Sequence, residues 1–249
     1  MPQRTLIPPD VYDIAFGWDV GPEIERLLFA CRSAGLEPQS ALELGCGTGR
    51  LLRGLERRVP DLTGLDLSPA MIDFARGRTR AQLHVADMSD FALDRTFDLV
   101  YASANTIRCV LEPAAIARLW RCVAAHVQVG GVFVADLEFG WPELNSPVFW
   151  TTARGPTAIR VSWTVVTPPD PATRCCRVQW VFEITDGEPR NCWTEEFPLR
   201  TYDAGEFVRI AAADGALAPH GLYLIRDPYL FETPAAQAVG RMLVVLQRV

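Results

Sequence analysis

The sequence predicts an α/β protein built on a doubly wound, mostly parallel sheet. Between residues 41 and 137, short apolar runs alternate with segments of helical periodicity. The first run leads directly into a glycine-rich turn, and the second ends in Asp66, 21 residues after Gly45. Alternation of this kind implies right-handed crossovers and a parallel sheet with helices on both faces.

The individual elements follow from local signals. The first 40 residues have helical spacing, with Gly35 as a stop. Ser68 is a good N-cap and Pro69 a good first helical residue for the helix that follows the second strand. Strands are predicted at 41–44, 62–67, 83–87, 97–102 and 132–137, and helices after Gly49, over 70–78 and over 113–127.

After residue 137 the pattern changes to strands with alternating faces. Residues 158–166, 175–184 and 192–199 predict an antiparallel three-stranded insertion, because turn-forming segments separate them. A helix over 204–213 and strands near 220–225 and 241–248 complete the chain. We expect one domain over 1–249, with a helical cap over 1–40. The β insertion, 138–202, is expected to form either a substrate cap or a homodimer contact.

Composition excludes several classes of protein. The formal net charge of −6 argues against nucleic acid as the main partner. All 24 basic residues are Arg, so mechanisms that need a lysine are excluded, and this bias is typical of a bacterial high-GC coding sequence. No signal peptide or membrane span is recognised, and the seven cysteines include no C-x-x-C pair. We therefore expect a cytoplasmic protein without a metal site.

The segment Glu43-Leu44-Gly45-Cys46-Gly47-Thr48-Gly49 lies between a strand and a helix. Glycines there allow positive φ and close approach of a ligand, at the sheet edge where such folds bind ligands. A dinucleotide fingerprint needs a third glycine at position 50, which holds Arg50. A nicotinamide-dependent oxidoreductase is therefore disfavoured.

Two aspartates end the next two strands. A carboxylate at Asp66 can accept both ribose hydroxyls of an adenosine ligand, and Asp87 can accept a hydrogen bond from the adenine amine. Alone, each Asp would more often be a cap or a solvated turn residue. Together with Glu43, they place three carboxylates at one sheet edge and predict an adenosine-type ligand.

These segments resemble the class I S-adenosylmethionine (SAM)-dependent methyltransferases. The resemblance rests on Leu42–Arg50, Gly64–Met71, Ala86–Met88, Phe97–Val100 and Val129–Gly131. It implies a seven-stranded Rossmann-like sheet with one antiparallel strand near the C-terminus, SAM as cofactor, and methyl transfer to an N or O atom of a small-molecule metabolite. A SAM-binding member of the fold with a non-methylating reaction is the alternative.

The resemblance also implies cofactor-binding residues. It places the glycine turn at the methionine part of SAM, Asp66 at the ribose and Asp87 with Met88 at the adenine. The N-terminal segment resembles a helix that folds over the cofactor in bacterial small-molecule enzymes, which include glycine and amino-sugar N-methyltransferases. The expected set is Tyr12, Trp18, Glu43, Gly45, Cys46, Gly47, Gly49, Asp66, Leu67, Met71, Asp87, Met88, Ser103 and Asn105.

Methyl transfer is an in-line displacement, so alignment supplies much of the rate. An amine needs only to arrive unprotonated, whereas a hydroxyl usually needs a base. Glu138 and His220 are the candidate bases. Four aromatic residues outside the predicted strands are expected to line an apolar or cationic substrate pocket: Trp141, Trp150, Tyr202 and Tyr229.

Overall fold

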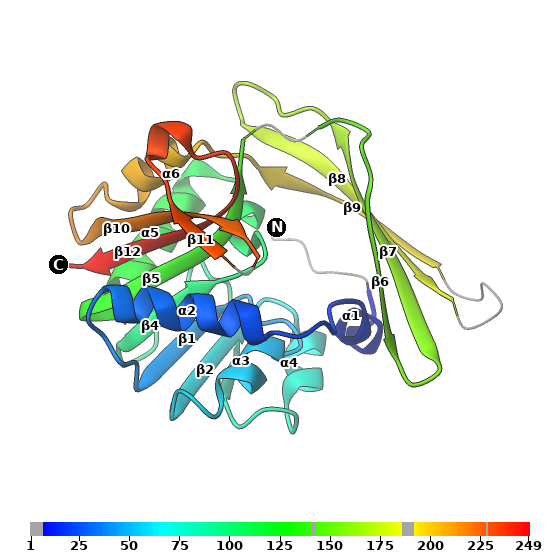
Figure 1. Ribbon diagram of the computed structural model, residues 1–249, viewed down its shortest axis with the longest axis horizontal. Coiled ribbons are helices and arrows are strands. Elements are labelled where there is room, and N and C mark those ends of the chain that lie inside the picture. Colours follow the sequence, from blue (N-terminus) through cyan, green and yellow to red (C-terminus); the bar gives the residue numbers. More distant parts are fainter. Residues whose placement is uncertain (1–6, 141–142, 186–191, 228) are drawn as a thin grey trace.

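The computed structural model describes residues 7–140, 143–185, 192–227 and 229–249, which form two sheets (Figure 1). The larger sheet has eight strands in the order β11-β10-β12-β5-β4-β1-β2-β3, and the smaller has four in the order β6-β7-β8-β9. The predicted α/β class, with a mostly parallel sheet and an antiparallel insertion, is confirmed.

Five of the eight strands of the main sheet are parallel: β1 (Ser40–Leu44), β2 (Asp61–Asp66), β3 (Gln82–Val85), β4 (Phe97–Ala102) and β5 (Val127–Phe139). The last strand, β12 (Gly240–Arg248), runs antiparallel between β5 and β10 (Leu217–Arg226). A further strand, β11 (Tyr229–Glu232), pairs antiparallel with β10. It makes eight strands where seven were predicted, and it places Tyr229 in a strand rather than a loop.

Helices cover both faces of the main sheet. The helices are α1 (Pro9–Ala15), α2 (Gly21–Ser33), α3 (Arg50–Leu55), α4 (Pro69–Ala75), α5 (Pro113–His126) and α6 (Ala204–Ala211), with 3-10 turns η1 (Thr106–Cys109) and η2 (Ala235–Gln237). All six residues of β4 are buried, because the sheet is covered on both sides. Among the described residues, no helix is long and apolar enough to cross a bilayer.

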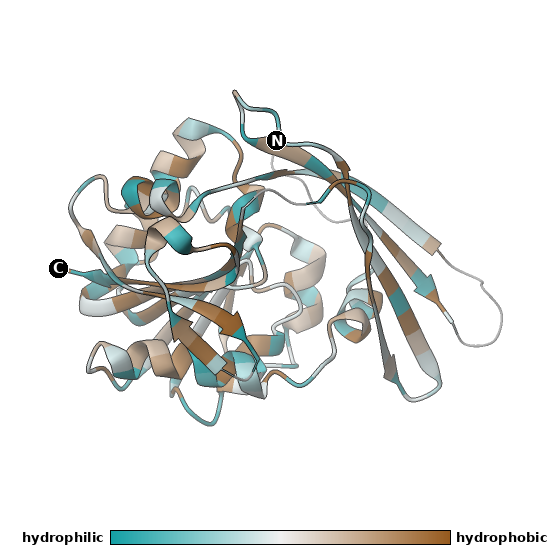
Figure 2. Ribbon diagram, turned by 45° about the horizontal axis from the view of Figure 1, so that its top comes forward, coloured by the Kyte–Doolittle hydropathy of each residue, from teal (hydrophilic) through white to brown (hydrophobic). Residues whose placement is uncertain are grey.

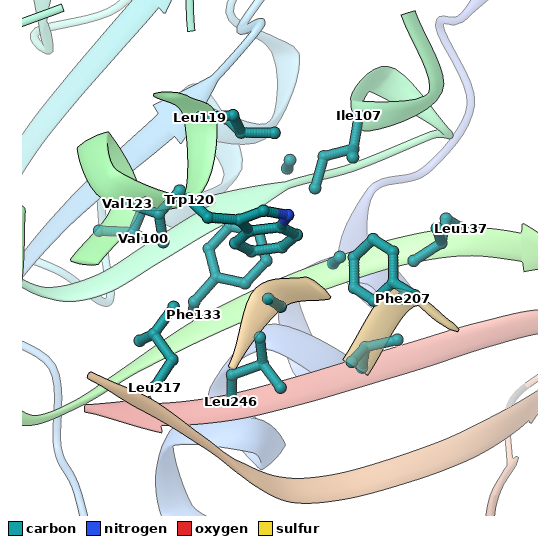
Figure 3. Packing of buried hydrophobic residues seen from close by; sticks show 14 of the residues in the cluster. Val100, Ile107, Leu119, Trp120, Val123, Phe133, Leu137, Phe207, Leu217 and Leu246 are labelled. Atoms are coloured by element: carbon teal, nitrogen blue, oxygen red, sulfur yellow. The ribbon is translucent and has the colours of Figure 1, made fainter. Parts of the chain in front are cut away.

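The core on the α5 and α6 face shows how the helices are held. Trp120 of α5 packs edge-on against Phe133 of β5 and Phe207 of α6, with ring centroids 5.3 Å apart in each case (Figure 3). Edge-to-face aromatic contacts of this kind add to the gain from burying their area. On the opposite face, α2 and α3 bury their leucines against β1 and β2. The carboxyl ends of the parallel strands are thereby held in a rigid frame.

The insertion consists of β6 (Val148–Arg154), β7 (Thr157–Thr167), β8 (Cys175–Ile184) and β9 (Cys192–Arg200). Three strands were predicted, and the missed one, β6, contains Trp150, which therefore lies in a strand rather than a loop. Hydrophobic and hydrophilic residues alternate along these strands (Figure 2). We call the face that carries Val161, Trp180 and Phe182 the inner face of the insertion, because it packs against α1.

Helix α1 lies between the two sheets (Figure 1). Val11, Ala15 and Phe16 form one apolar cluster with the inner face of the insertion. The N-terminal segment therefore joins the insertion to the edge of the main sheet where β1 and β2 end.

Candidate cofactor and acceptor site

The glycine turn follows β1 and is pinned to β2. The backbone N–H groups of Gly45 and Cys46 donate to the carbonyl oxygen of Leu65 at 2.8 and 2.9 Å. Gly45 and Gly47 have φ of +72° and +53°, the left-handed region that favours glycine. A Cβ on Gly45 would lie 2.4 Å from Cγ2 of Thr106, so glycine is also required there by the close approach of η1.

Asp66 organises this turn. One carboxylate oxygen accepts from the backbone N–H of Gly47 and the other from that of Ser68, both at 2.8 Å. Burial raises the pKa of Asp66 above its ordinary value, and these two hydrogen bonds oppose the rise. Because a carboxylate oxygen has more than one acceptor site, Asp66 can also receive hydroxyl groups of a ligand.

A hollow opens above the turn, at the carboxyl ends of β1 and β4. This is the point where the strand order reverses direction, the usual ligand position in such sheets. Its walls come from α1, the glycine turn, the start of α3 and the loop after β4. They consist of Tyr12, Phe16, Glu43, Gly45, Cys46, Gly47, Thr48, Arg50, Leu51, Ser103, Ala104 and Thr106.

Two ionisable side chains line the hollow. Glu43 accepts a hydrogen bond from the hydroxyl of Tyr101 at 3.1 Å, and its burial raises its pKa to about 8. Arg50 donates from one terminal nitrogen to Glu23 at 2.7 Å and lies 5.0 Å from the ring centre of Trp18. Its other terminal nitrogen is buried without a hydrogen-bond partner among the described residues. A buried donor of this kind calls for an anionic acceptor.

The residues present therefore fit SAM. The glycine cradle admits a ligand close to the backbone, Asp66 offers acceptors for ribose hydroxyls, and Arg50 offers a donor for the carboxylate of an amino-acid tail. Among the described residues, no cluster of three or more His, Cys, Asp or Glu side chains is arranged to hold a metal ion.

Six of the predicted cofactor residues line the hollow: Tyr12, Glu43, Gly45, Cys46, Gly47 and Ser103. Met88 lies beside them, since its Cε would be 3.4 Å from a Cβ on Gly45. The Cys46 side chain packs toward Gly64, so this residue reaches the hollow through its backbone.

Other predicted cofactor residues lie around the hollow or in its supports. Asp87 accepts from both the backbone and the hydroxyl of Ser89, at 2.8 and 2.9 Å, and so holds its own turn. Gly49 faces Ala75, Met71 is buried in the first turn of α4, and Leu67 is half-buried.

Asn105 and Trp18 stabilise the surroundings of the hollow and do not line it. The side chain of Asn105 accepts from the backbone N–H of Glu138 at 2.7 Å and thereby ties the loop after β4 to β5. The indole N–H of Trp18 donates to Glu23, so Trp18 covers the Glu23–Arg50 ion pair rather than the hollow.

Sequence reasoning missed two important groups. Arg50 stood directly after the glycine motif and could have been found there. Asp13 could not, because its partners are distant in sequence: it accepts from Arg53 at 3.0 Å and from Arg154 of β6 at 2.7 Å. Burial raises the pKa of Asp13, but these hydrogen bonds outweigh burial and hold it below its ordinary value. Since Arg53 also donates to the carbonyl of Thr48, Asp13 links the glycine turn, α1 and the insertion.

The structure does not bring either candidate base into this hollow. Glu138 is exposed near the end of β5, in register with Arg241 of β12. His220 lies in β10 and lines a separate hollow with Val208 and Leu246.

The three described aromatic residues among those expected in the substrate pocket are also dispersed. Trp150 donates its indole N–H to the carbonyl of Ala15 at 2.8 Å and packs against α1. Tyr202 is buried in the main core, and Tyr229 is exposed on β11. Trp141 lies outside the described residues.

The fold and the hollow are those of an α/β protein with a candidate site for an adenosine-type ligand at the carboxyl ends of β1 and β4. Residues 41–131 match the family described as "Methyltransferase domain". The chain is also 32% identical, over 165 residues, to the dTDP-3-amino-3,4,6-trideoxy-alpha-D-glucopyranose N,N-dimethyltransferase of Streptomyces venezuelae, covering 63% of this chain and 69% of that relative. The protein therefore belongs to the class I SAM-dependent methyltransferases, and SAM is its methyl donor.

A second relative is the dTDP-3-amino-3,6-dideoxy-alpha-D-glucopyranose N,N-dimethyltransferase of Streptomyces fradiae, 33% identical over 161 residues, 61% of this chain and 63% of that one. Among solved structures, Streptomyces venezuelae DesVI matches with a TM-score of 0.81 at 24% identity, covering 99% of this chain and 100% of that one. The sugar N-methyltransferase KedS8 from a Streptoalloteichus species matches with a TM-score of 0.77 at 24% identity, covering 99% and 95%. These two structures establish the fold over nearly the whole chain.

Proposed function

We propose that the protein methylates the amino nitrogen of a nucleotide-linked amino sugar. The relatives named above act, by their names, on the amino groups of dTDP-linked sugars. The structural observation that carries the proposal is the position of Tyr12. It lines the cofactor hollow and also lies 6.2 Å, centroid to centroid, from Trp180 on the inner face of the insertion. The insertion therefore adjoins the place from which an acceptor must approach.

The inner face of the insertion is suited to an amine. Glu195 of β9 is the cross-strand partner of Trp180, and it is buried. The enclosed position of Tyr12 raises the pKa of its phenol, Arg50 opposes this, and the negative charges of Asp66 and Glu195 raise it further. Asp66 and Glu195 are therefore within electrostatic reach of the same ring. A buried carboxylate on the same sheet face as an indole side chain favours a cationic or amino group over an anionic one.

SAM supplies a methyl group activated by its sulfonium. The protein has to hold the acceptor nitrogen in line with this carbon and keep water out, tasks that suit the enclosed walls formed by Tyr12 and the insertion. An amine acceptor attacks as its free base and needs no dedicated general base.

In this proposal the cofactor is held by residues of the main sheet edge. Asp66 accepts hydrogen bonds from the ribose hydroxyls, and Asp87 and Met88 lie at the adenine. Arg50 donates hydrogen bonds to the carboxylate of the amino-acid tail. The segment 1–40 caps the cofactor, and 138–202 forms the acceptor wall. The protein acts in the cytoplasm. If the insertion instead forms a homodimer contact, light scattering will give twice the mass of one chain.

The test is a methylation assay with SAM and a panel of acceptors read by mass spectrometry. We expect products carrying one and then two added methyl groups on a dTDP-linked amino sugar. Trans-aconitate, the acceptor named for another relative, serves as the comparison. Methylation of trans-aconitate without any methylation of the amino sugars would contradict the proposal.

A further inference from the structure

Arg108 is a buried guanidinium between the main sheet and the insertion. It lies in η1, two residues after Thr106 of the cofactor hollow, and only 2% of its surface is exposed. Its Nε donates to the carbonyl oxygen of Arg200 in β9 at 2.9 Å. Among the described residues, the two terminal nitrogens of Arg108 have no hydrogen-bond partner. Arg108 also forms no ion pair with any of these residues.

Burying a positive charge of this kind costs free energy unless an anion lies beside it. Arginine keeps its charge in proteins, and a charge taken out of water has to be compensated by a partner. Arg26, the other arginine buried to this degree in the described chain, pairs with Asp227. Burial lowers the pKa of Arg108, against the opposing influence of nearby Cys176 and Glu138. Arg108 thus has a fork of donors and a positive charge that the described side chains leave without a counter-ion.

The position of Arg108 is on the acceptor side of the site. Nearby Cys176 pairs with Leu199 across β8 and β9, and both are buried in one cluster of the insertion. Four residues further along β8 is Trp180, the partner of Glu195. The inner face of the insertion therefore runs from a cationic end at Arg108 to an anionic end at Glu195. An acceptor that carries an oxyanion at one end and an amine at the other matches this polarity.

We propose that Arg108 is the anion-recognising residue of the acceptor site and takes the diphosphate of a nucleotide-linked substrate. This inference rests on the proposed function for the identity of the acceptor. A guanidinium presents parallel N–H donors that match two phosphate oxygens, a geometry that an ammonium group lacks. The diphosphate would supply the counter-ion that the described residues do not, and the amine would then face Glu195.

The direct test is calorimetric titration of dTDP, and separately of inorganic pyrophosphate, into protein saturated with S-adenosylhomocysteine. Arg108→Met is expected to weaken dTDP binding about 10- to 100-fold, the loss of one charge-assisted pair. Arg108→Lys should show an intermediate loss, because it keeps the charge without the fork. The matched control is Arg118→Met, which removes an exposed arginine of α5 and should bind dTDP like the wild type.

Arg108→Gln is a second variant that is expected to fold, because the glutamine amide can still donate a hydrogen bond toward the carbonyl of Arg200. It should fold, as judged by circular dichroism, bind S-adenosylhomocysteine normally and show the same loss of dTDP affinity. If Arg108→Gln and Arg108→Met bind dTDP like the wild type but melt at lower temperature, Arg108 is only a brace between η1 and β9, and the inference is wrong.

The two proposals can fail separately. If the wild type binds dTDP or pyrophosphate, loses this with Arg108→Gln, and methylates no amino sugar, the anion site stands and the proposed function fails. If the wild type methylates an amino sugar free of phosphate as well as its dTDP-linked form, and binds neither dTDP nor pyrophosphate, the anion site is overturned while amine methylation stands.

Discussion

The carboxylate of Asp66 accepts a hydrogen bond from the backbone N–H of Gly47 at 2.8 Å. The residue that ends β2 thus sets the conformation of the turn that follows β1. Two features that look independent in the sequence, the glycine motif and the aspartate 21 residues after its first glycine, form one unit. Loss of either is expected to disturb the other.

Asp66→Ala should weaken SAM binding. It removes the proposed ribose acceptor and the acceptor of the Gly47 N–H together, and charge-assisted hydrogen bonds contribute about 1.5–3 kcal/mol each. Calorimetry should show a fall in affinity of at least about tenfold. Asp73→Ala, which removes an exposed carboxylate from α4, is the control. A folded Asp66→Ala protein with wild-type SAM affinity would remove Asp66 from the site.

Gly47→Val should abolish SAM binding in a protein that still folds. A β-branched residue at φ of +53° is strained, and its side chain would extend into the hollow toward Tyr12. Gly35→Val is the matched control, because Gly35 has φ of +72° and open space around it. Both variants should lose about 1–3 kcal/mol of stability from backbone strain. Only Gly47→Val should lose the cofactor, and equal SAM affinity in both variants would contradict this.

Glu43 should make stability depend on pH. Its pKa is raised from the ordinary value of 4.5 to about 8 in the folded protein, so the folded state holds a proton that the unfolded chain releases. This contribution is complete below pH 4.5 and is lost as pH rises toward and through 8. Glu43→Gln removes the titration and can keep the hydrogen bond from Tyr101. Melting temperature should fall less for Glu43→Gln than for the wild type between pH 5 and 8, and parallel curves would refute the assignment.

Asp13 should stabilise α1 more than either of its arginine partners does. Asp13→Ala removes two charge-assisted hydrogen bonds and should cost about 1–3 kcal/mol in urea unfolding. Arg154→Met should cost less, because the Arg154 side chain is 54% exposed and its interaction is weakened by water. Asp13→Ala should also weaken SAM binding, since Arg53 holds the carbonyl of Thr48 in the glycine turn. Equal stability losses for the two variants would argue against a central role for Asp13.

Substitutions of Tyr202 should change stability, whereas substitutions of Trp180 should change acceptor binding. Tyr202 was expected to line the substrate pocket, but it is buried with its ring centre 5.4 Å from that of Phe207. Tyr202→Ala should therefore cost about 3–5 kcal/mol of stability, as for other large aromatic deletions. Trp180→Phe should instead raise the KM for the acceptor at unchanged SAM affinity. A rise in acceptor KM for a conservative Tyr202→Phe variant, with no change for Trp180→Phe, would reverse these assignments.

The sequence by itself determined the parallel half of the fold and the cofactor edge. Glycine turns, N-caps and strand-terminal aspartates act within a few residues of themselves, and the parallel sheet brings all strand ends to one edge. For that reason the hollow contains Glu43, Gly45 and Gly47, which the sequence placed at this edge, whereas the hydrogen bond from the Gly47 N–H to Asp66 was seen only in the structure. That these residues bind SAM stays a prediction until the variants above are measured.

Only the tertiary structure decided the acceptor side. β6 and β11 form through pairing with neighbouring strands, and strand formation depends on such pairing more than on local propensity. Asp13 meets Arg154 from 141 residues away, and Arg108 meets the carbonyl of Arg200 from 92 residues away. Charged residues of this kind look like surface residues in a sequence, because their burial is set by the docking of the insertion on α1 and η1. Local patterns hold no information about that docking.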